Sequence, residues 1–463
     1  MIFAMKKELS RALKRFYGVG DCGFTLMTSV EGYYFNFFLT NIAAFSIPVV
    51  TFITTLTSVI DACLSWIYGA VLNSIKSQKW GRYRSWLILT AWMVPFLYAF
   101  QFLKLGDGVL SVVVIVVASV LVHIAWNFPW TANVAMINVA AKTPDDRVQL
   151  SSTRAAWANL SKVIFSYVGP TLAAFFAGWI GESNQFAATA FVLGCVMFAL
   201  YFAHFKMFDG YEEVETSSAD VTKEEKTDGK DMLKALFGNR PLIFLLLSDI
   251  AKWMFNFICM GVATYYFTYV AKNAGLLATY ILVSNLLCVV GSYLSKPIAK
   301  RFSARGTTIA VFLFMTALLC AAFLVYQNVL VVIILMSLAQ LGYGITYACT
   351  PALYGDTCIY SEWKTGKDAT GWIMGLQNVP LKIGNVSRGL VISACLGAVA
   401  FDASVDAALA PAAWLQGISI GFTLVPAAAL FLGALLLIFG FDITKEKVMS
   451  YQSEIDRRKQ TAA

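Results

Sequence analysis

Residues 109–126 read VLSVVVIVVASVLVHIAW and contain no Asp, Glu, Lys or Arg. A helix needs about 20 apolar residues to cross a bilayer, because each residue advances about 1.5 Å through roughly 30 Å of hydrocarbon. By that criterion about twelve such stretches recur between Phe16 and Ile443, most of them separated by a few polar residues. The chain is therefore predicted to be an all-α membrane protein.

The predicted membrane helices follow one another along almost the whole chain. They cover roughly residues 16–40, 47–74, 86–104, 109–140, 151–180, 186–208, 241–270, 276–299, 307–327, 329–358, 370–400 and 411–441. We expect them to form two six-helix bundles, residues 1–208 and 241–443, joined by a polar linker at 209–240 and followed by a tail at 444–463.

The composition leaves little sequence for a soluble domain. Of the 463 residues, 59% are hydrophobic and 13% are charged, against about 25% charged residues in soluble proteins. The net charge of +8 is small and the basic residues lie in loops, so nothing indicates a nucleic-acid partner. The nine cysteines form no CxxC pair, which favours packing over a disulfide framework.

The sequence gives little support to an enzyme. It contains no HExxH or Walker A pattern, and no GxSxG in the strand-to-helix context of a hydrolase. Gly18, Gly20 and Gly23 match the dinucleotide fingerprint, but no strand precedes them. Small residues at the start of a membrane helix are typical of close helix packing. We therefore expect neither catalysis nor a cofactor.

Basic residues are concentrated in alternate loops. One side of the predicted membrane carries Lys6, Lys7, Arg11, Lys14, Arg15, Lys76, Lys79, Arg82, Arg84, Lys142, Arg147, Lys300, Arg301, Arg305, Lys364, Lys367 and the tail from Lys445 to Lys459. The opposite loops contain little more than Lys104 and Lys272. The positive-inside rule then predicts a multi-pass protein of the cytoplasmic (inner) membrane with both termini in the cytoplasm.

Two features repeat between the predicted halves. The loop from Lys79 to Arg84 is echoed by the loop from Lys300 to Arg305. Prolines also interrupt corresponding helices of the two halves, at Pro129, Pro170, Pro351 and Pro380. Matched interruptions of this kind predict a substrate site near the bilayer midplane, at the interface between the repeats.

Ionisable residues inside membrane helices are candidates for function, because each costs about 2.5–3.5 kcal/mol at the helix centre. They are Asp21, Glu31, Asp61, Arg154 and Lys162 in the first half, and Asp249, Lys252, Lys296, Lys382 and Arg388 in the second. Asp249 and Lys252 are three residues apart on one helix, which predicts a local ion pair. Glu31, Asp61, Lys162 and Lys382 lack an opposite charge nearby in sequence. We expect them to pair across helices, bind a cation or take up a proton, with a static ion-pair cluster as the alternative.

Several motifs carry a resemblance to a known family. They are Tyr17-Gly-Val-Gly-Asp21, Asp61 with Gly69, Trp80-Gly-Arg-Tyr-Arg84, Tyr265-Tyr-Phe-Thr-Tyr-Val270 and Asp356-Thr-Cys-Ile-Tyr-Ser-Glu-Trp-Lys-Thr-Gly366, the last being the most specific. With them the chain resembles the glycoside–pentoside–hexuronide:cation symporters, relatives of melibiose permease within the major facilitator superfamily, over nearly its whole length. The resemblance implies the major facilitator superfamily fold. The resemblance implies two packed helical bundles, alternating access, and sugar uptake driven by sodium, lithium or proton.

The resemblance also implies roles for individual residues. Asp61 falls on a cation-site carboxylate, Arg154 on an arginine that contacts sugar, and Lys382 on a lysine near the cation site. Gln377 and Tyr347 fall on positions that line the cavity, where aromatic side chains such as Trp126 could stack on a sugar ring or simply pack.

The chain departs from the family pattern at several positions. Ser65 stands in place of a second carboxylate, Asn127 in place of an aspartate, and Thr25 where the family's galactoside-binding aspartate is expected. Asp368 and Thr370 follow the last motif where an arginine and a glutamate are common. These differences argue against galactoside specificity and against sodium as the coupling ion.

Three groups of candidate residues result. Cation coupling is assigned to Asp61, Asn127, Glu31 and Lys382, substrate binding to Arg154, Lys162, Thr25, Tyr347, Gln377 and Trp126, and a cytoplasmic gate to Arg82, Arg84, Asp356, Glu362 and Lys364. No resident metal is expected.

The predicted function is secondary active transport of a glycoside, pentoside or hexuronide, coupled to a monovalent cation. A hard cation needs several oxygen ligands, whereas a proton needs one carboxylate, so H⁺ is favoured over Na⁺. The basic residues Arg154, Lys162 and Lys382 favour an acidic sugar. An uncoupled facilitator in which Lys162 replaces the ion, a carrier of a non-sugar solute, and a non-transporting membrane sensor remain alternatives. We expect a monomer whose other partners are membrane lipids.

Overall fold

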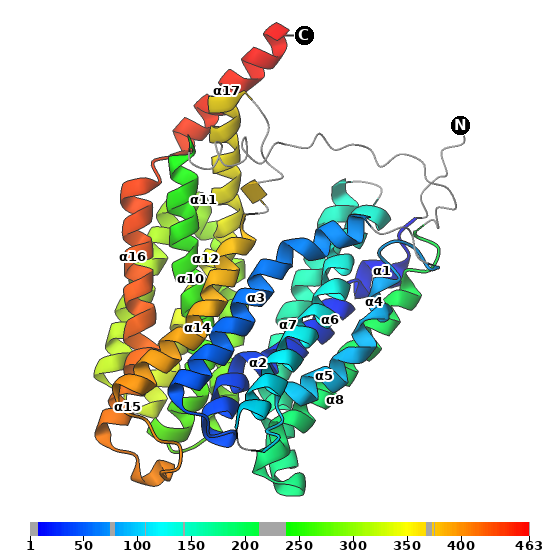
Figure 1. Ribbon diagram of the computed structural model, residues 1–463. Helices are drawn as coiled ribbons and strands as arrows, with labels where there is room; N and C mark the ends of the chain where they lie inside the picture. Colours follow the sequence, from blue (N-terminus) through cyan, green and yellow to red (C-terminus); the bar gives the residue numbers. More distant parts are fainter. Residues whose placement is uncertain are drawn as a thin grey trace. The chain divides into compact units, whose positions relative to one another are not determined.

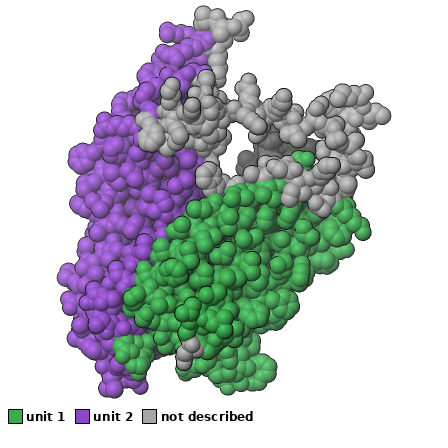
Figure 2. Space-filling view, viewed as in Figure 1, with its two compact units in different colours: residues 1–219, 277–282, 402–404 green, residues 220–276, 283–401, 405–463 purple. Residues whose placement is uncertain are grey.

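The computed structural model describes residues 8–74, 79–106, 108–141, 144–212, 238–366, 373–374 and 376–462. Within these ranges the regular elements are helices (Figure 1). The chain divides into two compact units, of which the first comprises residues 1–219, 277–282 and 402–404 and the second the remaining residues (Figure 2). The predicted boundaries at 208 and 240 stay a prediction, and residues 213–237 of the predicted linker lie outside the described residues.

The first unit is an assembly of long apolar helices. Its elements are α1 (Arg11–Phe16), α2 (Val19–Phe37), η1 (Phe38–Ile42), α3 (Ile47–Ser74), α4 (Trp86–Leu89), η2 (Ala91–Met93), α5 (Val94–Gln101), α6 (Val109–Ala140), α7 (Pro144–Ile180), η3 (Glu182–Asn184) and α8 (Gln185–Met207). Helix α2 packs against α7 and α8, and α6 packs against α3 and α5. Side chains of α2 and α6 are therefore placed to meet those of several other helices.

The second unit is built in the same way. Its elements are α10 (Arg240–Tyr265), η4 (Tyr266–Val270), α11 (Leu276–Leu324), α12 (Val329–Thr365), α14 (Asn378–Ala398), η5 (Ala407–Leu409), α15 (Ala412–Ser419), η6 (Ile420–Leu424), α16 (Val425–Gly440) and α17 (Lys445–Ala462). Residues 277–282 of α11 are the exception, since they belong to the first unit. Helix α10 packs against α12, α14 and α16, so its polar side chains are enclosed by three neighbours.

The helices agree with the predicted membrane spans. Eight helices of the described residues are long and apolar enough to cross a membrane. One of them, α11, contains two predicted spans, because Ser303 adopts φ 64° and ψ 162° and breaks the helix between them. The other predicted spans fall on α2, on α4 with α5, and on α14. Helices α2 and α14 are less apolar because they carry intramembrane charges, and α4 and α5 are short.

Two helices extend beyond the predicted spans. Helix α7 begins at Pro144 rather than at residue 151, and α12 continues to Thr365 rather than ending at 358. Hydropathy locates the apolar part of a helix, but helical hydrogen bonding continues until a stop signal. In α12 that signal is Gly366, whose φ of 71° and N–H bond to the Glu362 carbonyl form a left-handed cap.

The glycines at the start of α2 allow close helix packing, as predicted. A Cβ atom at Gly18 would lie 2.6 Å from Trp157 Cβ of α7, and one at Gly23 would lie 2.9 Å from Met197 Cα of α8. Because real Cβ atoms do not approach so closely, a larger residue would push the helices apart. This contact holds the polar face of α2 against its neighbours.

Candidate coupling and substrate sites

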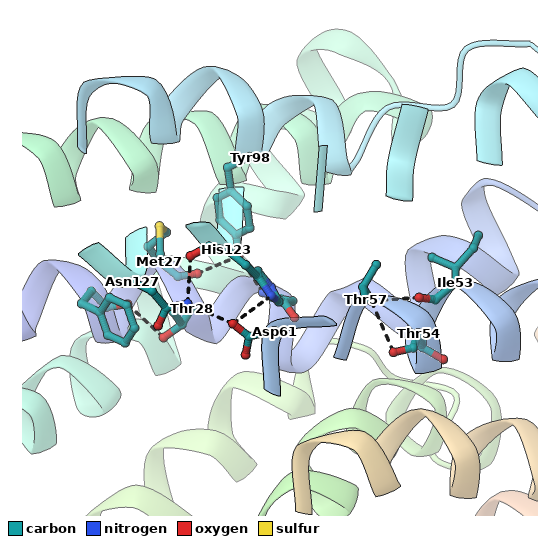
Figure 3. Close-up of polar contacts among 11 residues, drawn as sticks. Met27, Thr28, Ile53, Thr54, Thr57, Asp61, Tyr98, His123 and Asn127 are labelled. Carbon is teal, nitrogen blue, oxygen red and sulfur yellow. Dashed lines mark hydrogen bonds and ion pairs between the residues drawn. The ribbon is translucent and has the colours of Figure 1, made fainter. Parts of the chain in front are cut away.

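Three helices of the first unit bring an imidazole between two carboxylates. His123 Nε2 on α6 lies 2.9 Å from Glu31 Oε2 on α2. On the other side of the ring, His123 Nδ1 lies 3.7 Å from Asp61 Oδ1 on α3 (Figure 3). The three side chains are 6%, 11% and 7% exposed for His123, Glu31 and Asp61 respectively. We call this group the histidine triad.

Neighbouring polar groups hold the histidine triad in place. Asn127, one turn after His123, donates from Nδ2 to Asp61 Oδ1 at 3.0 Å and to the His123 carbonyl at 2.8 Å. The Tyr98 hydroxyl accepts from the Glu31 backbone N–H at 2.8 Å and donates to the Met27 carbonyl at 2.9 Å (Figure 3). This hydroxyl is thus inserted into the hydrogen-bond ladder of α2 at Glu31.

The donor set of the histidine triad consists of two carboxylates and one imidazole. Na⁺ prefers several oxygen ligands, by the reasoning that applies to Ca²⁺ and Mg²⁺, yet an imidazole occupies the space between the carboxylates. Asn127 presents an N–H₂ group to Asp61 rather than an oxygen. Across the described ranges, no group of three or more His, Cys, Asp or Glu residues has the geometry of a metal site.

A second polar cluster lies nearer the start of α2. Arg154 of α7 donates from Nε to Asp21 Oδ2 at 2.8 Å and from an Nη to Asp21 Oδ1 at 2.5 Å, which is a bidentate pair. Asn133 of α6 adds a hydrogen bond from Nδ2 to Asp21 Oδ2 at 2.8 Å, and the Tyr17 hydroxyl donates to the Asn133 carbonyl. Arg154 is 18% exposed and Asp21 is 7% exposed, so the pair is partly reachable from outside the packed helices.

The structure brings together some of the predicted site residues. The histidine triad and its surroundings contain Asp61, Glu31 and Asn127. The centroid of the Trp126 ring lies 4.5 Å from that of the His123 ring. Thr25 and Lys162 are half-buried on α2 and α7, and the acidic partner of Arg154 is Asp21 rather than a group at position 25. The other predicted residues, Lys382, Tyr347 and Gln377, belong to the second unit, where Tyr347 is 51% exposed and Gln377 donates to the Met374 sulfur.

Two of the predicted gate residues, Arg84 and Lys364, form hydrogen bonds within their own units. Arg84 bonds Asp209 at 2.6 Å and the Phe205 carbonyl at 2.9 Å, and its backbone N–H donates to Glu212. Arg82 is half-buried beside it. In the second unit Asp356 and Glu362 are half-buried on α12, and Lys364 donates to the Gly238 carbonyl. Some positions that the sequence analysis singled out lie outside the described parts of the structure. They are Asp368, Thr370 and the side chains of Ser65, Lys76, Lys142, Arg147 and Lys367.

The second unit contains the local ion pair that the sequence predicts. Lys252 Nζ lies 2.5 Å from Asp249 Oδ1, and the two side chains are 1% and 4% exposed. Lys252 also donates to Thr350 Oγ1 at 2.7 Å, and the Tyr354 hydroxyl lies 3.4 Å from Asp249 Oδ2. The Trp253 ring lies over the ammonium group. The positive charge of Lys252 and the negative charge of Asp249 therefore neutralise each other within α10.

The sequence analysis did not identify His123 or Asn133 as site residues, and it assigned Asp21 to none of the three groups. His123 could have been noticed, because it is one of two histidines in the chain and lies in an apolar stretch, where an ionisable side chain is costly. Asp21 stood out as an intramembrane carboxylate, but its partner is 133 residues away. Asn133 gave no signal, since an asparagine in a membrane helix is more often a packing residue than a ligand.

Helices of membrane-spanning length and buried polar clusters inside them are the features expected of a multi-pass membrane transporter. The family profile described as MFS/sugar transport protein matches residues 16–445. The chain belongs to this family, which confirms the resemblance to the sugar:cation symporters drawn from its motifs.

Curated relatives match almost the whole chain at low identity. The chain is 26% identical to the uncharacterized symporter YnaJ of Bacillus subtilis, over 98% of this chain and 96% of that protein. It is 25% identical to the isoprimeverose transporter of Lactiplantibacillus pentosus (91% and 87%) and 23% identical to the glucuronide carrier protein homolog of Escherichia coli (98% and 97%).

Solved structures share the fold. A bacterial homologue of the lysosomal transporter Spinster superposes with a TM-score of 0.66 at 14% identity, covering 92% of this chain and 96% of that one. The D-xylose–proton symporter superposes with a TM-score of 0.64 at 13% identity, covering 94% and 98%. At these identities the likeness concerns the fold alone.

Proposed function

We propose that this protein is a proton-coupled symporter of a glycoside, pentoside or hexuronide that works by alternating access. The observation that carries the proposal is the pairing of two clusters on the same helices. Helices α2 and α6 each contribute to the histidine triad and to the Asp21–Arg154 pair. A shift of either helix would change both clusters, which is the physical basis of coupling between an ion and a substrate.

The coupling ion is proposed to be H⁺. Two carboxylates around one imidazole can each gain or lose a proton, and their charge state depends on how far the helices hold them apart. The imidazole nitrogens are poor ligands for a hard monovalent cation, which reduces the number of oxygens available to Na⁺. Asp61 is the carboxylate that falls on a cation-site position of the family.

The substrate is proposed to be a sugar bound through its hydroxyl groups. The Asp21 carboxylate can accept from a sugar hydroxyl, and the Arg154 guanidinium can donate to one. Because Asp21 already neutralises Arg154, a sugar carboxylate would gain less here than the basic residues alone suggested. The names of the relatives, an isoprimeverose transporter and a glucuronide carrier homolog, support both a neutral and an acidic glycoside.

The protein is proposed to act as a monomer in the cytoplasmic (inner) membrane, surrounded by lipid, with both termini in the cytoplasm. The support is the excess of Lys and Arg in alternate loops, which orients membrane proteins with the basic loops inside.

Uptake into proteoliposomes tests the function. Purified protein would be given labelled D-xylose, isoprimeverose, methyl β-D-glucuronide and melibiose under an inward proton gradient, an inward sodium gradient, or neither. We expect accumulation of at least one pentoside or glucuronide that follows the proton gradient. Accumulation that follows sodium alone would refute proton coupling, and equilibration without accumulation would identify a facilitator. No uptake of any sugar would refute the substrate class.

A further inference from the structure

His123 occupies a position that joins two carboxylates from different helices. Its Nε2 lies at hydrogen-bond distance from Glu31, 2.9 Å away, whereas its Nδ1 lies 3.7 Å from Asp61. The second distance exceeds that of a hydrogen bond. In the tautomer that donates its Nε2 proton to Glu31, the Nδ1 lone pair faces the Asp61 carboxylate oxygen, and the two repel each other. One additional proton between Nδ1 and this oxygen would turn the repulsion into attraction.

Further titratable groups lie on the helices that pack against α6. Helix α3 contributes Tyr68, whose ring packs on Phe128 of α6, and α5 contributes Tyr98, which is held by α2. Helix α4 (Trp86–Leu89) has no titratable side chain. Helix α7, which packs against α6, carries Lys162. The two carboxylates of the triad lie 2.9 Å and 3.7 Å from the imidazole nitrogens.

We infer that His123 carries the coupling proton, which binds between His123 Nδ1 and Asp61 Oδ1 while Nε2 stays bonded to Glu31. This inference rests on the proposed proton symport and names the residue that performs it. One proton enters from the aqueous side and forms an N–H or O–H bond, the charge of the triad rises by one, and the same proton leaves on the other side. No other bond breaks.

The geometry also explains how the proton would be released. Asp61 is on α3, and His123 is on α6, so a relative displacement of the two helices lengthens the 3.7 Å separation. The attraction that holds the proton falls with that distance. Because Asn127 follows His123 on α6 and contacts Asp61, it keeps the carboxylate aligned only while the helices are together.

Imidazole ¹⁵N NMR tests the inference without any substrate. The chain has two histidines, His123 and His204, so a His204→Gln variant assigns the remaining signal. In nanodiscs we expect the His123 ring to change protonation between pH 4 and 9, and Asp61→Asn to move that transition. A ring that stays in one protonation state across the whole range in the wild type would overturn the inference.

Transport provides the second readout. With the sugar that gives uptake in the wild type, His123→Gln is expected to reduce proton-driven accumulation about 30-fold or more, within the range of known couplings, while exchange of internal for external sugar persists. The ratio of the two rates normalises for altered expression. His204→Gln and Ser119→Ala, which removes a buried hydroxyl one turn from His123, serve as controls and are expected to keep the wild-type ratio.

The outcomes separate the two proposals. If the wild type shows no proton-driven uptake, the proposed function fails. If the wild type shows it and His123→Gln keeps the full ratio of accumulation to exchange, proton symport stands and the assignment of His123 fails.

Discussion

The two units hold their buried charges in different ways. In the second unit, Asp249 and Lys252 lie three residues apart on α10 and neutralise one another at 2.5 Å. In the first unit, Glu31, Asp61 and His123 come from three helices and place two acids around one imidazole. A pair on one helix keeps its geometry when helices shift, whereas a cluster across helices does not. Whether the partners come from one helix or from several therefore distinguishes a structural ion pair from a candidate switch, more than burial does.

The largest expected effect comes from breaking the pair in the second unit. Lys252→Met leaves Asp249 buried without its partner, which should lower the free energy of unfolding by about 3–5 kcal/mol. The double variant Asp249→Asn with Lys252→Met removes both charges and keeps an acceptor for Tyr354, so it should recover most of the stability. The stability of both variants can be measured by thermal unfolding in detergent, monitored by the labelling of buried cysteines such as Cys259. Equal stability of the single variant and the wild type would contradict a structural role.

The matching change in the first unit should affect transport rather than folding. Asp61→Asn removes the charge that faces His123 Nδ1 and should reduce the ratio of proton-driven accumulation to sugar exchange by about 30–100-fold. Thr57→Val, one turn earlier on α3 and buried, is the control and should leave that ratio unchanged. Proteoliposome uptake measures the ratio. Wild-type accumulation by Asp61→Asn would show that the comparison between the units is mistaken.

Arg154 tests whether geometry or charge matters in the substrate cluster. Arg154→Lys keeps the positive charge but loses the bidentate contact with Asp21, so the sugar KM should rise about 10-fold. The ratio of accumulation to exchange should stay unchanged, since the histidine triad is intact. Thr153→Ala on the same helix controls for local disturbance. A lost coupling ratio with an unchanged KM would assign Arg154 to the ion rather than to the sugar.

The smallest expected effect concerns α17, outside the membrane helices. The Trp363 indole N–H and then Arg458 lower the pKa of the Glu454 carboxyl below its ordinary value of 4.5. A lowered folded-state pKa means that the contact stabilises above pH 4.5 and is lost as the pH falls through the folded-state value. Hydrogen exchange of residues 445–458 should therefore be slower at pH 7 than at pH 3 after correction for the intrinsic rate. Glu454→Gln should remove the difference, and an unchanged pH dependence would argue against the contact.

The sequence was informative where the physics is local. Membrane spans, the break near Ser303 and the Asp249–Lys252 pair depend on residues close together in the chain, so hydropathy and helical spacing sufficed to predict them. Asp61 and Arg154 could be singled out because a charge in a membrane helix is costly. Helix ends were less predictable, since α7 and α12 continue past their apolar parts.

A polytopic helical protein with charges inside its membrane helices can be recognised from the amino-acid order alone, because the bilayer admits backbone only when its hydrogen bonds are satisfied within helices. Which of these charges meet depends on how the helices pack. His123 lies 92 residues from Glu31 along the chain, and Arg154 lies 133 residues from Asp21. Such contacts arise from how the faces of α2, α3, α6 and α7 pack, and close approach at Gly18 and Gly23 helps to set that packing.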